Sequence, residues 1–96
     1  MPEVRIIAKV TARKGKEEYL KNALQEILEP THAEPGCKVY EIYVSDSYGR
    51  FYFYEVWENK EALERHAVSA HFQRLTKTID GLLDGELEVN FVQMVG

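Results

Sequence analysis

The sequence predicts an α+β domain with the split βαβ order of ferredoxin-like folds, in which an antiparallel sheet carries helices on one face. The hydrophobic pattern reads as strand, helix, strand, strand, split helix, strand. The chain has 96 residues, enough for one domain and no more, so residues 1–96 are expected to fold as a single domain. Both faces of the central hairpin are largely apolar, which indicates that both are covered.

The first strand is expected over residues 4–12, which are rich in β-branched side chains, and residues 13–15 end it. A helix is expected from residue 16 to about residue 30, because apolar side chains recur there at spacings of three and four. That stripe consists of Tyr19, Leu20, Ala23, Leu24, Ile27 and Leu28. Pro30 lacks the amide proton that a helix interior requires, so the helix should kink or end there. Residues 34–36 have the composition of a turn.

The central hairpin is expected from two strands, residues 38–44 and 51–57, joined by a loop at residues 45–49. In the second strand, alternate side chains fall on opposite faces. One face carries Phe51, Phe53, Glu55 and Trp57, and the other carries Tyr52, Tyr54, Val56 and Glu58. Helices can cover one of these faces. In so short a chain, the expected cover for the other is a second subunit, which makes the protein a homodimer.

Asn59 is a good N-cap for a short helix through about residue 68, and Ser69 is the expected cap of another. The buried stripe of that second helix consists of Phe72, Leu75, Ile79, Leu82 and Leu83, and Gly85 is expected to close it. A last strand is expected over residues 86–95. Its apolar side chains change parity between Phe91 and Val92, which can mark a bulge or a strand tip that joins another subunit.

Charge and composition exclude several classes of protein. The chain has 12 basic and 16 acidic side chains and a net charge of −4, which argues against a nucleic-acid partner. Cys37 is the only cysteine, and a lone thiol suits a reducing compartment. No signal peptide is recognisable, and no run approaches the ~20 apolar residues of a membrane helix. We therefore expect a cytoplasmic protein with no membrane contact.

Three stretches of the chain form a recognisable combination: residues 34–37 (Glu-Pro-Gly-Cys) with Tyr40 shortly after, residues 50–58 (Arg-Phe-Tyr-Phe-Tyr-Glu-Val-Trp-Glu) and residues 66–72 (His-Ala-Val-Ser-Ala-His-Phe). Together they resemble the antibiotic biosynthesis monooxygenase family, including its quinol monooxygenase branch. The resemblance implies a dimeric α/β barrel, in which two sheets pack face to face, with a ligand pocket between sheet and helices. It also implies a cofactor-independent monooxygenase that uses molecular oxygen on a quinol-like or polyphenolic small molecule. In that chemistry the substrate supplies the electrons and the protein removes a phenolic proton.

His66 is the best candidate for the general base. It lies one turn after Ala62 and Leu63 and shares their inward face, and imidazole can take a phenolic proton near neutral pH. The alternative is a buried histidine bonded to the backbone. His71 is a candidate second proton carrier or a donor to the substrate anion; the alternative is a helix-start residue packed beside Phe72.

Glu55 is the third catalytic candidate, because a carboxylate among aromatic residues is costly unless it is paired. It could orient a histidine or share a proton with one. The alternative is a structural ion pair with Arg50, Arg5 or an arginine of the partner subunit.

Four aromatic side chains are the candidates for substrate binding: Trp57, Phe53, Tyr40 and Phe72. No metal site is expected, because the two histidines are five residues apart and no acidic ligand stands at a matching spacing. No GxGxxG or P-loop pattern occurs, so no cofactor is expected; flavin supplied by another protein stays open.

Three other functions compete with the oxygenase. One is isomerisation of a small carbonyl compound, as in autoinducer-2 processing relatives, and another is a ligand-binding dimer without turnover. The third is haem degradation, which the sequence disfavours. Relatives with that activity use Asn on the first strand, and Trp and His on the two helices. The aligned helix positions here hold His66 and Thr76, and the first strand has no Asn.

Overall fold

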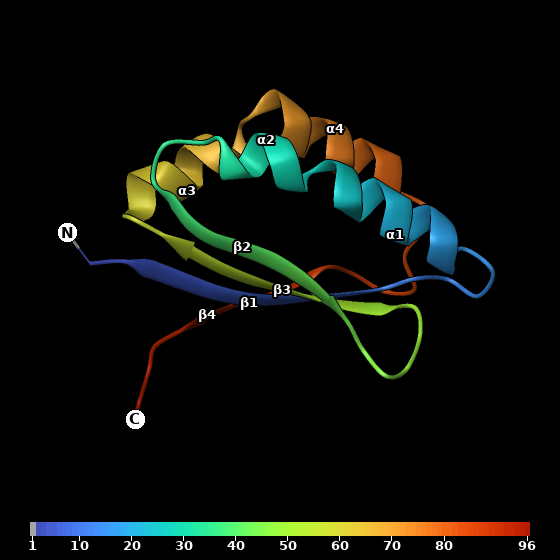
Figure 1. The fold of residues 1–96 in the computed structure, drawn as a ribbon. Coiled ribbons are helices and arrows are strands. Elements are labelled where there is room, and N and C mark those ends of the chain that lie inside the picture. Colours follow the sequence, from blue (N-terminus) through green and yellow to red (C-terminus); the bar gives the residue numbers. More distant parts are fainter. Residues whose placement is uncertain (1) are drawn as a thin grey trace.

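The computed structural model describes residues 2–96 as a four-stranded antiparallel sheet with all its helices on one face (Figure 1). The elements are β1 (Val4–Thr11), α1 (Glu17–Glu26), α2 (Leu28–His32), β2 (Cys37–Val44), β3 (Arg50–Trp57), α3 (Lys60–Ala67), α4 (Ala70–Ile79) and β4 (Glu88–Val92). The strands lie in the order β2-β3-β1-β4, and each neighbouring pair is antiparallel. This is the ferredoxin-like α+β fold that the sequence predicted.

The core lies between the helices and the inner face of the sheet. In β1 the alternate residues Ile6, Ala8 and Val10 are buried, as the period of two requires for a strand covered on one side. The register pairs Ile6 with Glu55 and Ala8 with Phe53, so the Glu55 carboxyl belongs to the same inner face. The predicted parity of the second hairpin strand is therefore confirmed, and it places a carboxyl group beneath the helices.

The expected helix over residues 16–30 is in fact two helices, with the break at Ile27 between α1 and α2. Pro30 lies inside α2, so the predicted kink or end occurs three residues earlier than expected, at Ile27. A proline ring clashes with the carbonyl four residues earlier, so the backbone hydrogen bonds of the helix are interrupted ahead of the proline, at Glu26. Tyr19 was also misassigned: it is 64% exposed, whereas Leu20 and Leu24 of the same stripe are buried.

The two predicted caps are confirmed, and the end of the last helix is not where the sequence placed it. The Asn59 side chain accepts from the Ala62 amide at 2.9 Å and begins α3, and Ser69 Oγ accepts from the Phe72 amide at 3.3 Å and begins α4. Helix α4 ends at Ile79 rather than at Gly85, because Gly81 already adopts a positive φ of 86°. Leu82 and Leu83 therefore follow the helix.

The outer face of the sheet carries no helix within residues 2–96 (Figure 1). Apolar side chains on it are only partly covered: Ile7 is 42% exposed and Tyr43 is 53% exposed. Strand β4 is shorter than the expected residues 86–95, and its inward-directed Phe91 also lies exposed at the edge of the sheet. None of the helices in residues 2–96 has the length and apolar character needed to cross a membrane.

Candidate functional site

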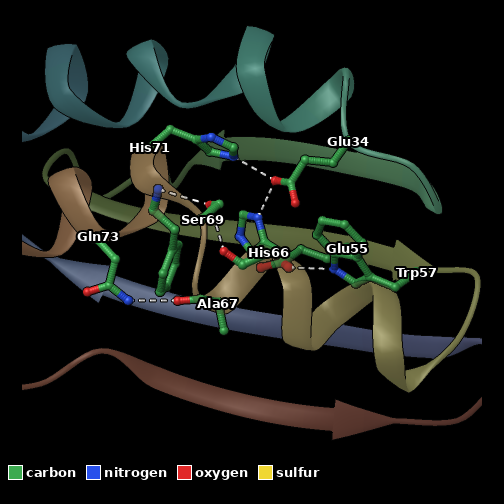
Figure 2. Close-up of polar contacts among 9 residues, drawn as sticks. Glu34, Glu55, Trp57, His66, Ala67, Ser69, His71 and Gln73 are labelled. Carbon is green, nitrogen blue, oxygen red and sulfur yellow. Dashed lines mark hydrogen bonds and ion pairs between the residues drawn. The ribbon is translucent and has the colours of Figure 1, made fainter.

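Two histidines and a glutamate from three separate segments meet above the inner face of the sheet (Figure 2). His66 Nδ1 and His71 Nε2 each lie 2.6 Å from the same oxygen, Oε2 of Glu34. His66 belongs to α3, His71 to α4, and Glu34 to the turn between α2 and β2. These distances are those of charge-assisted hydrogen bonds, so each ring nitrogen donates a proton to the Glu34 carboxylate.

The turn that carries Glu34 is held against α3 by a close backbone approach. Gly36 has a φ of 85°, and a Cβ built on it would lie 2.6 Å from Ala62 Cβ. The Gly36 carbonyl also accepts from the Glu58 amide at 2.7 Å, which ties the turn to the end of β3. Only glycine suits this conformation and this contact, so Gly36 sets the distance between Glu34 and the helix that carries His66.

His66 is held in one orientation by an aromatic cage. Its ring centroid lies 4.7 Å from that of Trp57, 4.8 Å from that of Phe72 and 5.4 Å from that of Tyr40. The side chain is only 3% exposed. Burial lowers the pKa of His66, an effect that the Glu34 carboxylate opposes and the neighbouring His71 reinforces. The ring is therefore neutral at neutral pH.

The second ring nitrogen of His66, Nε2, is buried and has no hydrogen-bond partner among residues 2–96. Because Nδ1 donates to Glu34, the single proton of the neutral ring sits on Nδ1 and Nε2 carries a free lone pair. A buried nitrogen without a partner is uncommon in a folded protein, and a catalytic role is one explanation for such a group.

His66 lines a cavity of about 110 Å³ between the inner face of the sheet, the last two helices and the segment that enters β4. Its other polar side chains are Glu55, Tyr40 and Thr76. The apolar lining consists of Ile6, Ala8, Val10, Phe53, Leu63, Ala67, Phe72, Leu75, Ile79, Leu87 and Val89. A largely apolar hollow with a few convergent polar groups is the usual form of a small-molecule site.

Glu55 supplies a second titratable group to this cavity. Trp57 Nε1 donates to Glu55 Oε1 at 2.9 Å (Figure 2), and the Glu55 side chain is buried. Burial raises the pKa of Glu55 to about 7, with the Trp57 hydrogen bond opposing the rise and the charge of Glu34 adding to it. The carboxyl group is thus poised to give or take a proton near neutral pH.

The partners predicted for Glu55 within this chain are not those that the structure shows, and an arginine of a partner subunit stays a prediction. No arginine of residues 2–96 forms an ion pair with it; Arg5 pairs with Glu3 and donates to Tyr54 instead. Glu34, and not Glu55, hydrogen-bonds to the histidines. Strand pairing explains the first difference, because Arg5 points to the outer face of the sheet, opposite to Glu55.

The structure brings the three predicted catalytic residues, His66, His71 and Glu55, into one region. Among the predicted substrate-binding residues, Phe53, Tyr40 and Phe72 line the cavity. Trp57 does not line it: the side chain is 0% exposed and packs against His66.

Sequence reasoning missed Glu34, which is 32 residues from His66 along the chain. The available signal was an acidic residue directly before the Pro-Gly turn. Only the fold shows that the turn lies against α3.

The same cluster bears on metal binding. The ligand atoms of Glu34, His66 and His71 all lie within 4.8 Å of one another, so an acidic group does stand beside the two histidines. The expectation from sequence spacing was therefore wrong about the acidic ligand. The N–O distances of 2.6 Å are hydrogen bonds, whereas two ligands of one tetrahedral zinc ion lie about 3.3 Å apart. The arrangement is a hydrogen-bonded cluster, and the expected absence of a metal stays a prediction.

Cys37 is half-buried at the start of β2. Burial raises the pKa of the Cys37 thiol, and the charges of Glu34 and Glu55 raise it further. The residue is therefore a thiol and not a thiolate at neutral pH, which agrees with a packing role rather than with a nucleophile.

The sequence is similar to one family model and to two known proteins. The family model described as antibiotic biosynthesis monooxygenase matches residues 3–78. The Synechocystis protein sll1783, whose function is uncharacterised, is 31% identical over 80 residues. The match covers 82% of this chain and 54% of that protein, so the chain spans about half the length of this relative. Rv0793 of Mycobacterium tuberculosis, which carries a provisional monooxygenase name, is 30% identical over 80 residues, or 83% of this chain and 79% of the relative.

Solved structures agree over nearly the whole chain. PA3566 from Pseudomonas aeruginosa superposes with a TM-score of 0.92 at 29% identity, over 100% of this chain and 97% of that one. The Rv0793 structure gives 0.92 at 26% identity, over 99% and 97%. A crystal structure described as an antibiotic biosynthesis monooxygenase gives 0.90 at 26% identity, over 97% and 99%. With the family model matching most of its length, the chain belongs to the antibiotic biosynthesis monooxygenase family.

Proposed function

We propose that the cavity beneath α3 and α4 is the active site of a cofactor-independent monooxygenase that acts on a quinol-like or polyphenolic ring, with His66 as general base. One observation carries the proposal: His66 Nε2 is buried and unpartnered within residues 2–96, and the His66 side chain lines a largely apolar cavity. A phenolic hydroxyl placed in that cavity would satisfy this nitrogen and give it the proton to be removed.

The reaction balances with no added reductant. A hydroquinone and molecular oxygen give a hydroxyquinone and water: one oxygen atom enters the ring, the other leaves as water, and the ring supplies the electrons. His66 takes the first phenolic proton, and Glu34 stabilises the imidazolium that forms. In its protonated form, Glu55 can donate to the oxygen that leaves as water. The apolar lining excludes bulk water from the anionic ring.

The size of the cavity favours a single ring. Its volume of about 110 Å³ compares with about 150 Å³ for an engineered cavity that holds benzene. Leu87 and Val89 form the wall on the β4 side, and both are exposed. A ring substituent can therefore extend past that wall, along the edge of the sheet.

Oxygen uptake tests this function. The wild-type protein is expected to consume oxygen with 1,4-hydroquinone above the rate without protein, and His66→Ala should lower kcat/KM by about 10²- to 10⁴-fold. Arg65→Ala is the matched control, because Arg65 neighbours His66 on α3 but is exposed and lies outside the cavity. Equal circular dichroism spectra would show that both variants fold.

Three results would contradict the proposal. Full activity in His66→Ala would show that His66 is not the general base. Turnover that persists without oxygen would identify a proton-transfer isomerase instead. Binding of hydroquinones with no turnover would favour a ligand-binding protein.

We also propose that the outer face of the sheet is covered by a second copy of the chain. The partly exposed apolar side chains of Ile7 and Tyr43 on this face support a homodimer. Size-exclusion chromatography with light scattering should give twice the chain mass of 11.1 kDa for the wild type. Ile7→Glu should give the monomer, because it buries a charge at the centre of the interface. A wild-type monomer at micromolar concentration would contradict the homodimer.

A further inference from the structure

We propose that His71 is a positioning residue for His66 that acts through Glu34: two imidazoles share one carboxylate oxygen, so His71 competes with His66 for its negative charge. This inference rests on the proposed role of His66 as base. It assigns His71 a role other than the predicted ones of second proton carrier or direct donor to the substrate anion.

The geometry excludes a direct role for His71 in the cavity. His66 lines the cavity beneath α3 and α4, whereas His71 is absent from its lining. His71 instead lines a separate hollow of about 80 Å³ between α1 and α4, together with Glu26, Arg74 and Thr78, which are exposed. His71 thus faces solvent on one side and Glu34 on the other.

Burial separates the two rings that share Glu34. The side chain of His66 is 3% exposed, that of Glu34 is 12% exposed and that of His71 is 19% exposed. Burial penalises the charged form of a ring, and His66 is the more deeply buried of the two. Because both rings contact the same oxygen, a charge on His71 neutralises the carboxylate that would otherwise stabilise a charge on His66.

The distance between the rings makes this competition strong. Their centroids lie 6.0 Å apart, within the range over which like charges in a partly buried site repel each other. The presence of His71 therefore keeps Nε2 of His66 unprotonated to lower pH. The downward shift of the His66 pKa, to which His71 contributes, agrees with this direction.

Other titratable groups also surround His66, and the test must hold them constant. They are Glu55 and Tyr40 from the sheet, and Glu34 itself. Replacing His71 leaves all of them in place. A change in the pKa of His66 when His71 is replaced can therefore be assigned to the loss of His71.

The experiment is ¹⁵N NMR titration of the histidine side chains, which requires no substrate. In His71→Gln, whose amide can still donate to Glu34 but carries no charge, the His66 pKa should rise by about one pH unit, a tenfold gain in proton affinity. His71→Ala should raise it at least as far, because Glu34 is then free for His66 alone. Lys77→Ala, an exposed change on α4, is the matched control and should leave the His66 pKa unchanged.

Activity gives a second readout. With 1,4-hydroquinone, the acidic limb of the kcat/KM profile should move to higher pH by the same unit in His71→Gln. A His66 pKa that does not move in either variant would overturn the inference even if hydroquinone turnover is confirmed. If instead one equivalent of Zn²⁺ shifts both histidine signals with micromolar affinity, the cluster is a metal site and the inference is also overturned. If the wild type does not turn over hydroquinone but the His66 pKa still rises in the His71 variants, only the proposed function is contradicted.

Discussion

Replacement of Glu55 by glutamine should stabilise the protein at alkaline pH and leave it unchanged at acidic pH. The glutamine side chain has the same shape as that of Glu55 and keeps an oxygen that can accept from Trp57 Nε1, but it carries no charge. Burial raises the pKa of Glu55 to about 7 from its ordinary value of 4.5. A shift of this size corresponds to about 3 kcal/mol between the two protonation states.

The sign follows from the direction of the shift. The folded protein holds the Glu55 proton more tightly than the unfolded chain, so this group stabilises the fold fully below pH 4.5. That contribution is lost as the pH rises to about 7. Wild type and Glu55→Gln should therefore be equally stable at pH 4.5, and the variant should be more stable by up to about 3 kcal/mol at pH 8. The separate destabilisation that follows from charging buried His66 at low pH is common to both proteins and cancels in the difference.

Urea denaturation at pH 4.5, 6 and 8, at one protein concentration, measures this difference. Glu64→Gln is the control, since Glu64 is exposed on α3 and should show no such pH-dependent gain. A Glu55→Gln effect that is the same at all three pH values would refute the reasoning. So would a variant that is less stable than the wild type at pH 8.

Two further changes test the packing of the site. Gly36→Ala should cost about 2 kcal/mol more than Gly15→Ala in urea denaturation, since both glycines have positive φ but only the new methyl at position 36 meets Ala62; equal costs would contradict the close approach. Trp57→Phe removes the donor that opposes the upward shift, so the Glu55 pKa should rise above about 7 in a ¹³C carboxyl titration, and an unchanged or lower value would contradict the hydrogen bond.

Local patterns predicted those parts of the fold that depend on neighbouring residues. Asn59 and Ser69 cap helices because their side chains accept hydrogen bonds from amides three residues later in the chain. A contact over so short a separation can be predicted from the local sequence. The alternation in β3 and the inward face of His66 follow from fixed periods in the same way. The helix break lies ahead of Pro30 because the proline disrupts the turn that precedes it. The last helix ends before Gly85 because Gly81 stops it first.

The contacts that define the site depend on tertiary approach, which no local pattern contains. Glu34 reaches His66 only because Gly36 lets the turn touch α3. Trp57 was expected to bind substrate, and it shares a strand face with Phe53 and Glu55. In the structure, Trp57 packs against the imidazole ring of His66 and donates a hydrogen bond to Glu55.

A crystal structure of the protein with 1,4-hydroquinone, prepared without oxygen, tests the central claim most directly. We expect the ring inside the cavity between Phe53 and Phe72, with one hydroxyl oxygen about 3 Å from His66 Nε2. A ring bound elsewhere, or a cavity that stays closed to it while Nε2 turns toward a protein group, would contradict this assignment.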